Sequence, residues 1–342
     1  MKHIIGSKPQ DGSAEVKTLI VDPESAGQRL DNYLLRLLKG VPKTHVYRII
    51  RSGEVRLNKG RATADRRIEV GDRVRVPPVR LPVRLTEKTK ASAGLAAPDV
   101  PAREFPILFE DETLMAIDKP AGVAVHGGSG VSFGVIEQLR MARPHARFLE
   151  LVHRLDRETS GILLIAKKRS ALKNLQDQFR ERETGKTYLA LVAGLWPLKL
   201  KVLDKPLHKY LLEDGERRVR VLARDDPQGM KSVTLVKVRE RFEVAQEHAA
   251  GGYSLLEVTI RTGRTHQIRV HLAAEGRPIL GDDKYGNFEL NRALHKQGLK
   301  RMFLHAWRLQ FKHPVRGEPI ELQSSLPGEL MRFLQHIMPA HA

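Results

Sequence analysis

Our interpretation of this chain starts from the stretch Leu151-Val-His153-Arg154-Leu-Asp156-Arg157-Glu-Thr159-Ser-Gly161-Ile-Leu-Leu-Ile165. Its apolar ends predict two buried elements joined by a charged loop. Arg154 and Arg157 flank Asp156 in sequence, and nearby guanidinium groups keep a carboxylate ionised. An ionised carboxylate in such a loop can act as a nucleophile or a base. The alternative is that Asp156 caps Thr159 and the arginines merely solvate it. Spacing alone favours that structural alternative.

Three further stretches carry candidate chemistry. Thr262–Leu272 predicts a loop holding Arg264, followed by a helix over 265–274 with Thr265 as its N-cap. Its histidines, at 266 and 271, are five residues apart, and the chain has no His-Glu-x-x-His, so a metal site is not expected. The Gly-rich stretch 118–130 lacks the Gly-Lys-Ser/Thr ending of a phosphate-binding loop. Tyr188 lies in a β-like run, where a lone tyrosine usually belongs to the core.

Composition limits the class of protein. The 342 residues suggest two domains, or two and a small module, and 41% are hydrophobic, enough for a packed core. Lys and Arg number 59 against 40 Asp and Glu, a net charge of +19 that favours a polyanionic partner, most often nucleic acid. The chain has no cysteine, which excludes disulfides and thiolate metal sites. No apolar run is long enough to span a membrane, and the N-terminal residues do not resemble a secretory signal.

The charge is concentrated near the N-terminus. Residues 24–84 contain 15 Lys and Arg against six Asp and Glu, a net +9. Leucines at 30, 34, 37 and 38 predict one helix that ends near Gly40, and Val46, Ile49 and Ile50 predict the apolar face of a second helix after Pro42. Alternation at 55–58 and valines at 70, 74 and 76 predict strands. Cations on the polar side of the second helix can contact a phosphate backbone, although they can equally form a solvated face.

These patterns divide the chain into five segments. We expect a flexible tail over 1–17, a small basic domain over 18–80, a Pro-containing linker over 81–103, a larger domain over 104–330 and a C-terminal tail over 331–342. In the larger domain, β-like runs (114–118, 162–166, 188–192, 255–261) do not alternate regularly with helical runs (135–141, 171–181, 265–274, 328–336), which predicts an α+β fold. The runs 232–242 and 253–261 flank Gly251-Gly252 and predict a hairpin.

The motifs occur together in a recognisable order: His153-Arg-Leu-Asp-Arg-Glu-Thr-Ser-Gly161, Lys186-Thr-Tyr-Leu-Ala190 and Thr262-Gly-Arg-Thr-His-Gln-Ile-Arg269. The chain resembles the RluA-type family of RNA pseudouridine synthases over about 105–325, most closely the group that modifies large-subunit rRNA. Residues 25–80 resemble an S4 RNA-binding domain, on Gln28-Arg-Leu-Asp31 and Gly53-Glu-Val-Arg-Leu-Asn58. The resemblance implies an α+β catalytic domain with a mixed, largely antiparallel central sheet, preceded by a small S4 (αL-like) domain.

The resemblance also implies an activity and its residues. Uridine in RNA, with large-subunit rRNA or its precursor particle as the expected substrate, would be isomerised to pseudouridine without a metal or other cofactor. Asp156 would be the catalytic carboxylate, Arg264 would pair with it and keep it ionised, and Tyr188 would stack on the flipped uracil. Arg154 would fill the space that the extruded base leaves. The other expected RNA contacts are cations of the S4 segment: Arg29, Lys43, Arg48, Arg51 and Arg56.

Two rival functions remain to be compared. An RNA-binding assembly factor with an idle site would share the charge and the S4 segment, but the intact Asp156, Tyr188 and Arg264 argue against it. A metal-dependent nuclease would need clustered carboxylates, and the adjacent pairs 225–226 and 282–283 match no known ligand pattern. We therefore expect a cytoplasmic, monomeric RNA-modifying enzyme.

Overall fold

The computed structural model describes residues 16–22, 25–38, 41–79, 100–127, 133–213, 215–243 and 251–337. The chain divides into two compact units, 1–99 and 100–342. Most of the predicted N-terminal tail and linker, and the end of the predicted C-terminal tail, lie outside the described residues. The sequence assigns residues 100–103 to the linker, but they belong to the second unit.

The first unit has the small α+β arrangement that the sequence predicts. It contains β1 (Lys17–Ile20), α1 (Leu30–Leu37), α2 (Lys43–Arg51), β2 (Arg56–Leu57) and β3 (Arg73–Val76), and its antiparallel sheet has the order β1-β3-β2. The apolar helical positions form its core, with Leu30, Leu34 and Val46 fully buried. The sequence predicts a strand from the valines at 70, 74 and 76, but Val70 precedes β3 and is 61% exposed.

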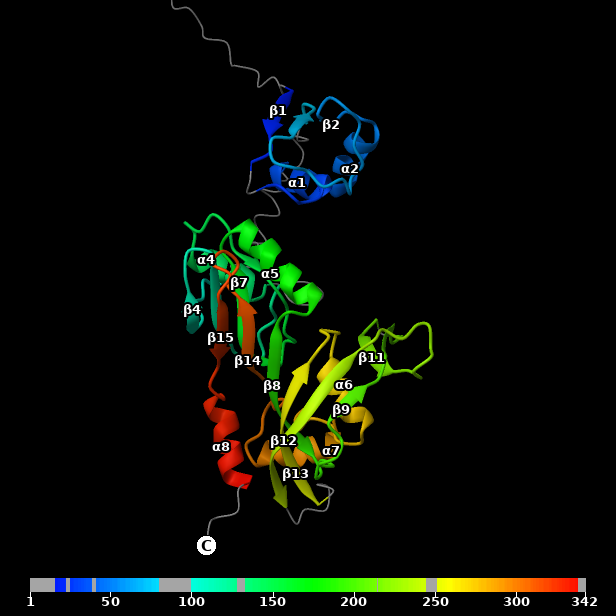
Figure 1. Ribbon diagram of the computed structural model, residues 1–342, viewed down its shortest axis with the longest axis vertical. Coiled ribbons are helices and arrows are strands. Elements are labelled where there is room, and N and C mark those ends of the chain that lie inside the picture. Colours follow the sequence, from blue (N-terminus) through cyan, green and yellow to red (C-terminus); the bar gives the residue numbers. More distant parts are fainter. Residues whose placement is uncertain are drawn as a thin grey trace, which may run out of the picture. The chain divides into compact units, whose positions relative to one another are not determined.

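The second unit is organised around a ten-stranded mixed sheet (Figure 1). Its main path is β4-β5-β7-β14-β8-β13-β12-β9, while β15 pairs with β14 and β6 pairs with β7. Among the described strands, β7 and β14 form a parallel pair and every other pairing is antiparallel, as expected. The strands are β4 (Ile107–Glu110), β5 (Leu114–Lys119), β6 (Glu150–Leu151), β7 (Ser160–Ala166), β8 (Gly185–Ala193), β9 (Val202–Asp204), β12 (Val233–Glu243), β13 (Gly252–Ile260), β14 (Leu304–Lys312) and β15 (Pro319–Gln323).

Helices bury both faces of the sheet. Alternate residues of β7 point to opposite sides: Leu163 packs in the cluster that contains α4 (Val135–Ala142), and Leu164 packs in the cluster that contains α5 (Arg169–Glu181). A third cluster joins β8 and β13 to α6 (Gln267–Ala274), α7 (Phe288–Lys296) and α8 (Gly328–Ile337). A separate hairpin, β10 (Leu207–Leu211) and β11 (Arg217–Val221), is paired antiparallel.

Two predicted boundaries are wrong. The predicted tail from 331 begins inside α8, whose Phe333 and Leu334 are buried in the main core, so the second unit extends beyond residue 330. The predicted N-cap Thr265 does not cap α6. The residue before this helix is His266, in the left-handed region at φ 52°, and no side chain caps the helix.

Gly161 explains the end of the Thr-Ser-Gly motif. Its φ is +109°, and a Cβ there would lie 2.3 Å from the carbonyl oxygen of Ala306. Only glycine lets β7 approach β14 this closely in this conformation. The loop that carries Asp156 therefore ends at a fixed point on the central sheet.

Candidate active site

The loop between β6 and β7 presents Asp156. The backbone N–H of Thr159 donates to the backbone carbonyl of Asp156 at 3.1 Å, so the turn is closed without the carboxylate. The structural alternative, in which the Asp156 side chain caps Thr159, is therefore wrong. The carboxylate is 27% exposed and is available to other partners.

A buried lysine fixes the backbone of this loop. Lys119 is fully buried at the end of β5, and its ammonium group donates to the carbonyl oxygens of Pro120, Val123 and Arg157 at 2.8, 2.8 and 3.0 Å. Burial lowers the pKa of Lys119 to about 7, and the neighbouring charge of Glu158 opposes that change. Three bonds from one group join the Gly-rich stretch after β5 to the residue that follows Asp156.

The arginine that pairs with Asp156 is Arg269. Its Nη1 donates to Oδ2 of Asp156 at 3.2 Å. The sequence predicts this pairing for Arg264, and that prediction is wrong: the Nε of Arg264 faces the backbone carbonyl of Lys231 at 3.4 Å instead. Arg264 precedes α6 and is half-buried, whereas Arg269 lies within the helix, on its buried side.

Three carboxylates hold the Arg269 guanidinium. Asp282 accepts two bonds from it, at 2.7 and 2.6 Å, and Asp283 lies 3.3 Å away. Burial opposes the charge of Arg269, but the bonds to Asp282 and the charges of Asp282 and Asp156 together raise its pKa. The adjacent aspartates that matched no metal pattern therefore orient a cation. Sequence reasoning missed them, although a charged residue inside a buried helix requires such a partner.

Tyr188 lies on β8, between β13 and β14. It is half-buried against two core clusters and also lines a cavity of about 360 Å³ with Asp156, Arg264 and Arg269. Burial, with a smaller contribution from the charge of Asp156, raises the pKa of the Tyr188 hydroxyl. The residue is thus both a core side chain and a wall of the site, and its hydroxyl stays protonated at neutral pH.

The two arginines beside Asp156 have different environments. Arg157 pairs with Glu158 at 2.9 Å. Arg154 is exposed, and within the described part of the chain no carboxylate lies within ion-pair distance of it. Arg154 lines both the 360 Å³ cavity and an adjoining one of about 660 Å³, which Lys209, Arg264 and Lys284 also line. Asp156 therefore lines both a small cavity and a wider one in whose lining Lys and Arg outnumber Asp and Glu.

The neutral imidazole of His153 holds the other side of the loop. Its Nε2 accepts from the backbone N–H of Leu164 at 3.1 Å, and its ring stacks on Phe179 at 4.7 Å between centroids. Burial, and then the charge of Lys186, lowers the pKa of His153 to about 4. An uncharged ring can accept this bond, so His153 attaches the start of the motif to the central sheet.

The predicted RNA contacts of the first unit are a set of cations on its surface. Lys43 and Arg51 are exposed on α2, while Arg48 pairs with Glu54 at 2.9 Å. Arg29 pairs with the buried Asp31 at 2.7 Å. The fifth, Arg56, is half-buried opposite Arg75 in the β2–β3 register. Pairing with acids leaves Arg29 and Arg48 less able to bind phosphate than Lys43 and Arg51.

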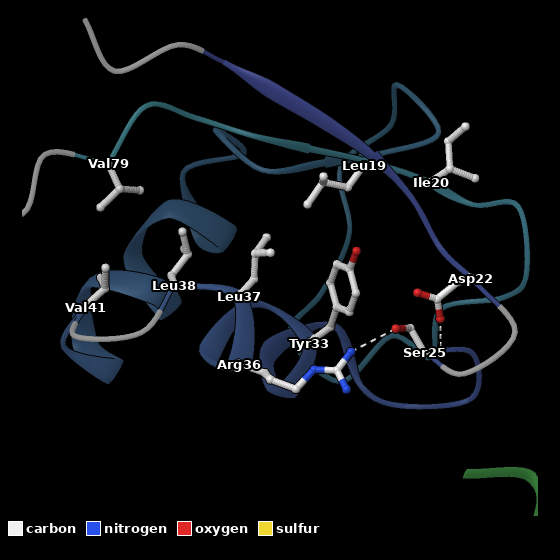
Figure 2. Close-up of a pocket in the computed structure, with 10 residues that line it drawn as sticks. All are labelled: Leu19, Ile20, Asp22, Ser25, Tyr33, Arg36, Leu37, Leu38, Val41 and Val79. Carbon is white, nitrogen blue, oxygen red and sulfur yellow. Dashed lines mark hydrogen bonds between the residues drawn. The ribbon is translucent and has the colours of Figure 1, made fainter. Parts of the chain in front are cut away.

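The first unit also has a hollow of about 570 Å³ (Figure 2). Its lining is mainly apolar, with Arg36 donating to the hydroxyl of Ser25 at 2.8 Å, and none of the five predicted cations lines it. Across the described ranges, no group of three or more His, Cys, Asp or Glu could hold a metal ion. Within the same ranges, no helix has both the length and the apolarity needed to cross a membrane.

Comparison with known proteins agrees with this geometry. Residues 113–274 match the RNA pseudouridylate synthase family and residues 28–74 match the S4 domain. The ribosomal large subunit pseudouridine synthase C of Pasteurella multocida is 50% identical over 319 residues, 93% of each chain. The Escherichia coli K12 protein of the same name is 48% identical over 327 residues, 95% of this chain and 98% of its own.

Solved structures of RNA pseudouridylate synthase domains also resemble this chain. The structure of human RNA pseudouridylate synthase domain containing 1 is 26% identical, with a TM-score of 0.54, covering 66% of this chain and 85% of that one. That of human RNA pseudouridylate synthase domain containing 4 is also 26% identical, with a TM-score of 0.53, and it covers 74% and 97%. An aspartate bound by an arginine shares a cavity with a tyrosine, and relatives are 48–50% identical along nearly the whole chain. The chain therefore belongs to the RNA pseudouridylate synthase family.

Proposed function

We propose that this protein converts uridines of large-subunit rRNA, or of its precursor particle, to pseudouridine. The observation that carries the proposal is the Asp156 carboxylate, bonded by the buried Arg269 and facing a cavity that Tyr188 lines. The relatives with 48–50% identity are named for this activity on the large ribosomal subunit. The activity occurs in the cytoplasm, where ribosomal subunits are assembled, and the protein acts as a monomer.

The reaction exchanges one bond for another within the nucleotide. The N1–C1′ bond of uridine breaks, the uracil turns, and C5 bonds to C1′ while the C5 proton is lost and N1 gains one. Asp156 acts as nucleophile or base, and Arg269 keeps its charge and direction. Tyr188 stacks on the uracil with its hydroxyl protonated. A protonated hydroxyl can take up the C5 proton only as it gives its own proton to a base, and the Asp156 carboxylate in the same cavity can accept it.

Access to the reacting bond requires the target nucleotide to leave its stack, at a cost of a few kcal/mol. Arg154, exposed at the mouth of the cavity, fills the vacated space, and Arg264 contacts the nearby RNA backbone from the wider cavity. The S4 unit adds affinity through Lys43, Arg51 and the neighbouring Arg56.

The test uses the full chain with transcribed large-subunit rRNA and with subunits from cells that lack the protein. Pseudouridine is mapped by carbodiimide labelling and primer extension. New pseudouridines at defined positions, in either substrate, support the proposal. RNA binding without any new pseudouridine in both substrates would instead support the assembly factor. Size-exclusion chromatography with light scattering checks the monomer, and a mass near twice 38.6 kDa would contradict it.

A further inference from the structure

His266 occupies an unusual position at the active site. It directly precedes α6 in the left-handed region, at φ 52°. A residue other than glycine adopts this conformation only at an energetic cost, and only where its surroundings fix it. The ring is 14% exposed and lies between two groups, the Asp156 carboxylate and the Tyr285 hydroxyl.

Tyr285 fixes the far side of this ring. Its hydroxyl lies 2.8 Å from Nδ1 of His266, and it accepts a hydrogen bond from the backbone N–H of Val219 at 3.0 Å. Val219 belongs to β11, so the hydroxyl joins the β10–β11 hairpin to the start of α6. The two rings meet edge to face, with centroids 5.5 Å apart.

This network determines where the neutral His266 ring carries its proton. The Tyr285 oxygen already accepts from Val219, so its own proton needs an acceptor, and among the described residues Nδ1 of His266 is the one within reach. If Nδ1 instead carried the proton, the Tyr285 hydroxyl proton would have no partner. The imidazole proton therefore belongs on Nε2. Burial lowers the pKa of His266, which favours this neutral ring, although the Asp156 charge opposes the effect.

The Nε2–H faces one particular oxygen of Asp156. Nε2 lies 4.0 Å from Oδ2, the same oxygen to which Arg269 donates at 3.2 Å. A movement of about 1 Å would bring Nε2 within hydrogen-bonding distance. Oδ1 has no hydrogen-bond partner among the described residues. Arg269 therefore donates to Oδ2, His266 lies nearest the same oxygen, and Oδ1 remains without a partner among the described residues.

We propose that His266 is a positioning residue for Asp156: its Nε2–H, aimed by Tyr285, acts with Arg269 on Oδ2, so that Oδ1 is the oxygen presented to the nucleotide. The inference rests on the proposed function. It adds that Tyr285 links the position of the β10–β11 hairpin to the orientation of the Asp156 carboxylate. The base of this hairpin packs against α6, with Leu207, Val219 and Val270 in one cluster.

The first experiment separates the two nitrogen positions of the ring. In single-turnover assays with RNA containing [5-³H]uridine, His266→Ala should slow tritium release about 10–100-fold and change the RNA Kd less than twofold, because misaiming a reacting group by about 1 Å costs up to ~100-fold. His266→Gln places an amide near the position of Nε2 and should recover at least a third of the native rate. His266→Asn suits the left-handed backbone but reaches only as far as Nδ1, so it should remain slow. The exposed His295 provides a matched control, and His295→Ala should retain the native rate.

The second experiment tests the contribution of Tyr285. Tyr285→Phe keeps the ring but removes the hydroxyl that aims His266, so it should slow release by a similar factor. In the His266→Ala background it should add less than a twofold further loss. Hydrogen exchange at the amide of Val219 should quicken in Tyr285→Phe and stay near native in His266→Ala.

Three outcomes of the rate measurements would overturn the inference: a His266→Ala rate within twofold of native, a His266→Asn rate equal to that of His266→Gln, or multiplicative losses in the double variant. A fall in RNA affinity as large as the fall in rate would also overturn it. If the native protein itself releases no tritium, the proposed function fails. Native release together with any of these results overturns the positioning role alone.

Discussion

Arg269→Met is the substitution that most clearly separates the stability of this protein from its chemistry. It removes a guanidinium that is buried with the fully buried Asp282 and that bonds Asp156. Loss of one partner from a buried ion pair leaves an uncompensated charge and costs about 3–5 kcal/mol. For a unit of this size each kcal/mol lowers Tm by about 2–4 °C, so we expect a fall on the order of 10 °C in the transition of the second unit.

A second substitution should restore the stability and not the activity. Asp282→Asn removes the stranded charge but retains Oδ1, which accepts from the backbone N–H groups of Lys284 and Tyr285 at 2.8 and 3.0 Å. The double variant Arg269→Met/Asp282→Asn should recover at least half of the fall in Tm. It should still release tritium from [5-³H]uridine RNA at least 100-fold more slowly than the native protein, because Asp156 no longer has its donor.

The matched control is Asp283→Asn. Asp283 faces the same guanidinium at 3.3 Å, but its side chain is 69% exposed. A pair with one partner this exposed contributes about 0–1 kcal/mol, so Tm should change by no more than about 4 °C. The reasoning is refuted if Arg269→Met melts within 3 °C of the native protein, or if the double variant regains activity in proportion to its stability.

Three further predictions concern other parts of the molecule. Burial lowers the pKa of His305 to about 4. Between about pH 6.5 and 4 this histidine is therefore protonated in the unfolded chain but not in the folded one. On going from pH 7 to pH 5, it should lower the free energy of unfolding by about 2 kcal/mol. Because burial also lowers the pKa of His153 to about 4, urea unfolding at both values should show a loss larger than this, and His305→Gln should reduce it. An equal loss in the variant would contradict the assignment. Tyr188→Phe keeps the ring that stacks on uracil, so RNA Kd should stay within about twofold while tritium release slows at least 10-fold; an unchanged rate would remove the hydroxyl from the chemistry. Replacing Lys43, Arg51 and Arg56 of the S4 unit with glutamine should lower RNA affinity. It should also reduce the slope of log K against log[salt] by about 0.7–0.9 for each phosphate that the protein no longer neutralises. An unchanged slope would show that these side chains do not touch the RNA backbone.

Helices and strands whose apolar residues recur at a regular spacing could be predicted from the sequence. The leucine spacing after Arg29 gives α1, and the hairpin predicted around Gly251-Gly252 is formed by β12 and β13. The helix α7 was missed, although Asn287 accepts from the backbone N–H groups of Glu289 and Leu290, a typical N-cap. Its apolar face has only Leu290 and Leu294 buried, too short a pattern to stand out.

The composition of the active site could be predicted only in part. Asp156 and Tyr188 meet in one cavity, as the motifs indicate. The resemblance assigns the pairing to Arg264, and this prediction is wrong. Arg264 lies in a polar loop, whereas Arg269 lies among six consecutive buried residues that begin at Gln267. Burial of a guanidinium depends on partners elsewhere in the chain, here Asp282, and a local pattern does not contain that information.

The direct test of the account is single-turnover tritium release by Asp156→Asn. Asparagine has nearly the shape of aspartate but no charge for Arg269 to hold, and the turn through the backbone carbonyl of residue 156 stays intact. We predict that this variant binds large-subunit rRNA with a Kd within about threefold of native and releases no tritium above background. Release at the native rate would contradict the claim that this carboxylate carries out the reaction.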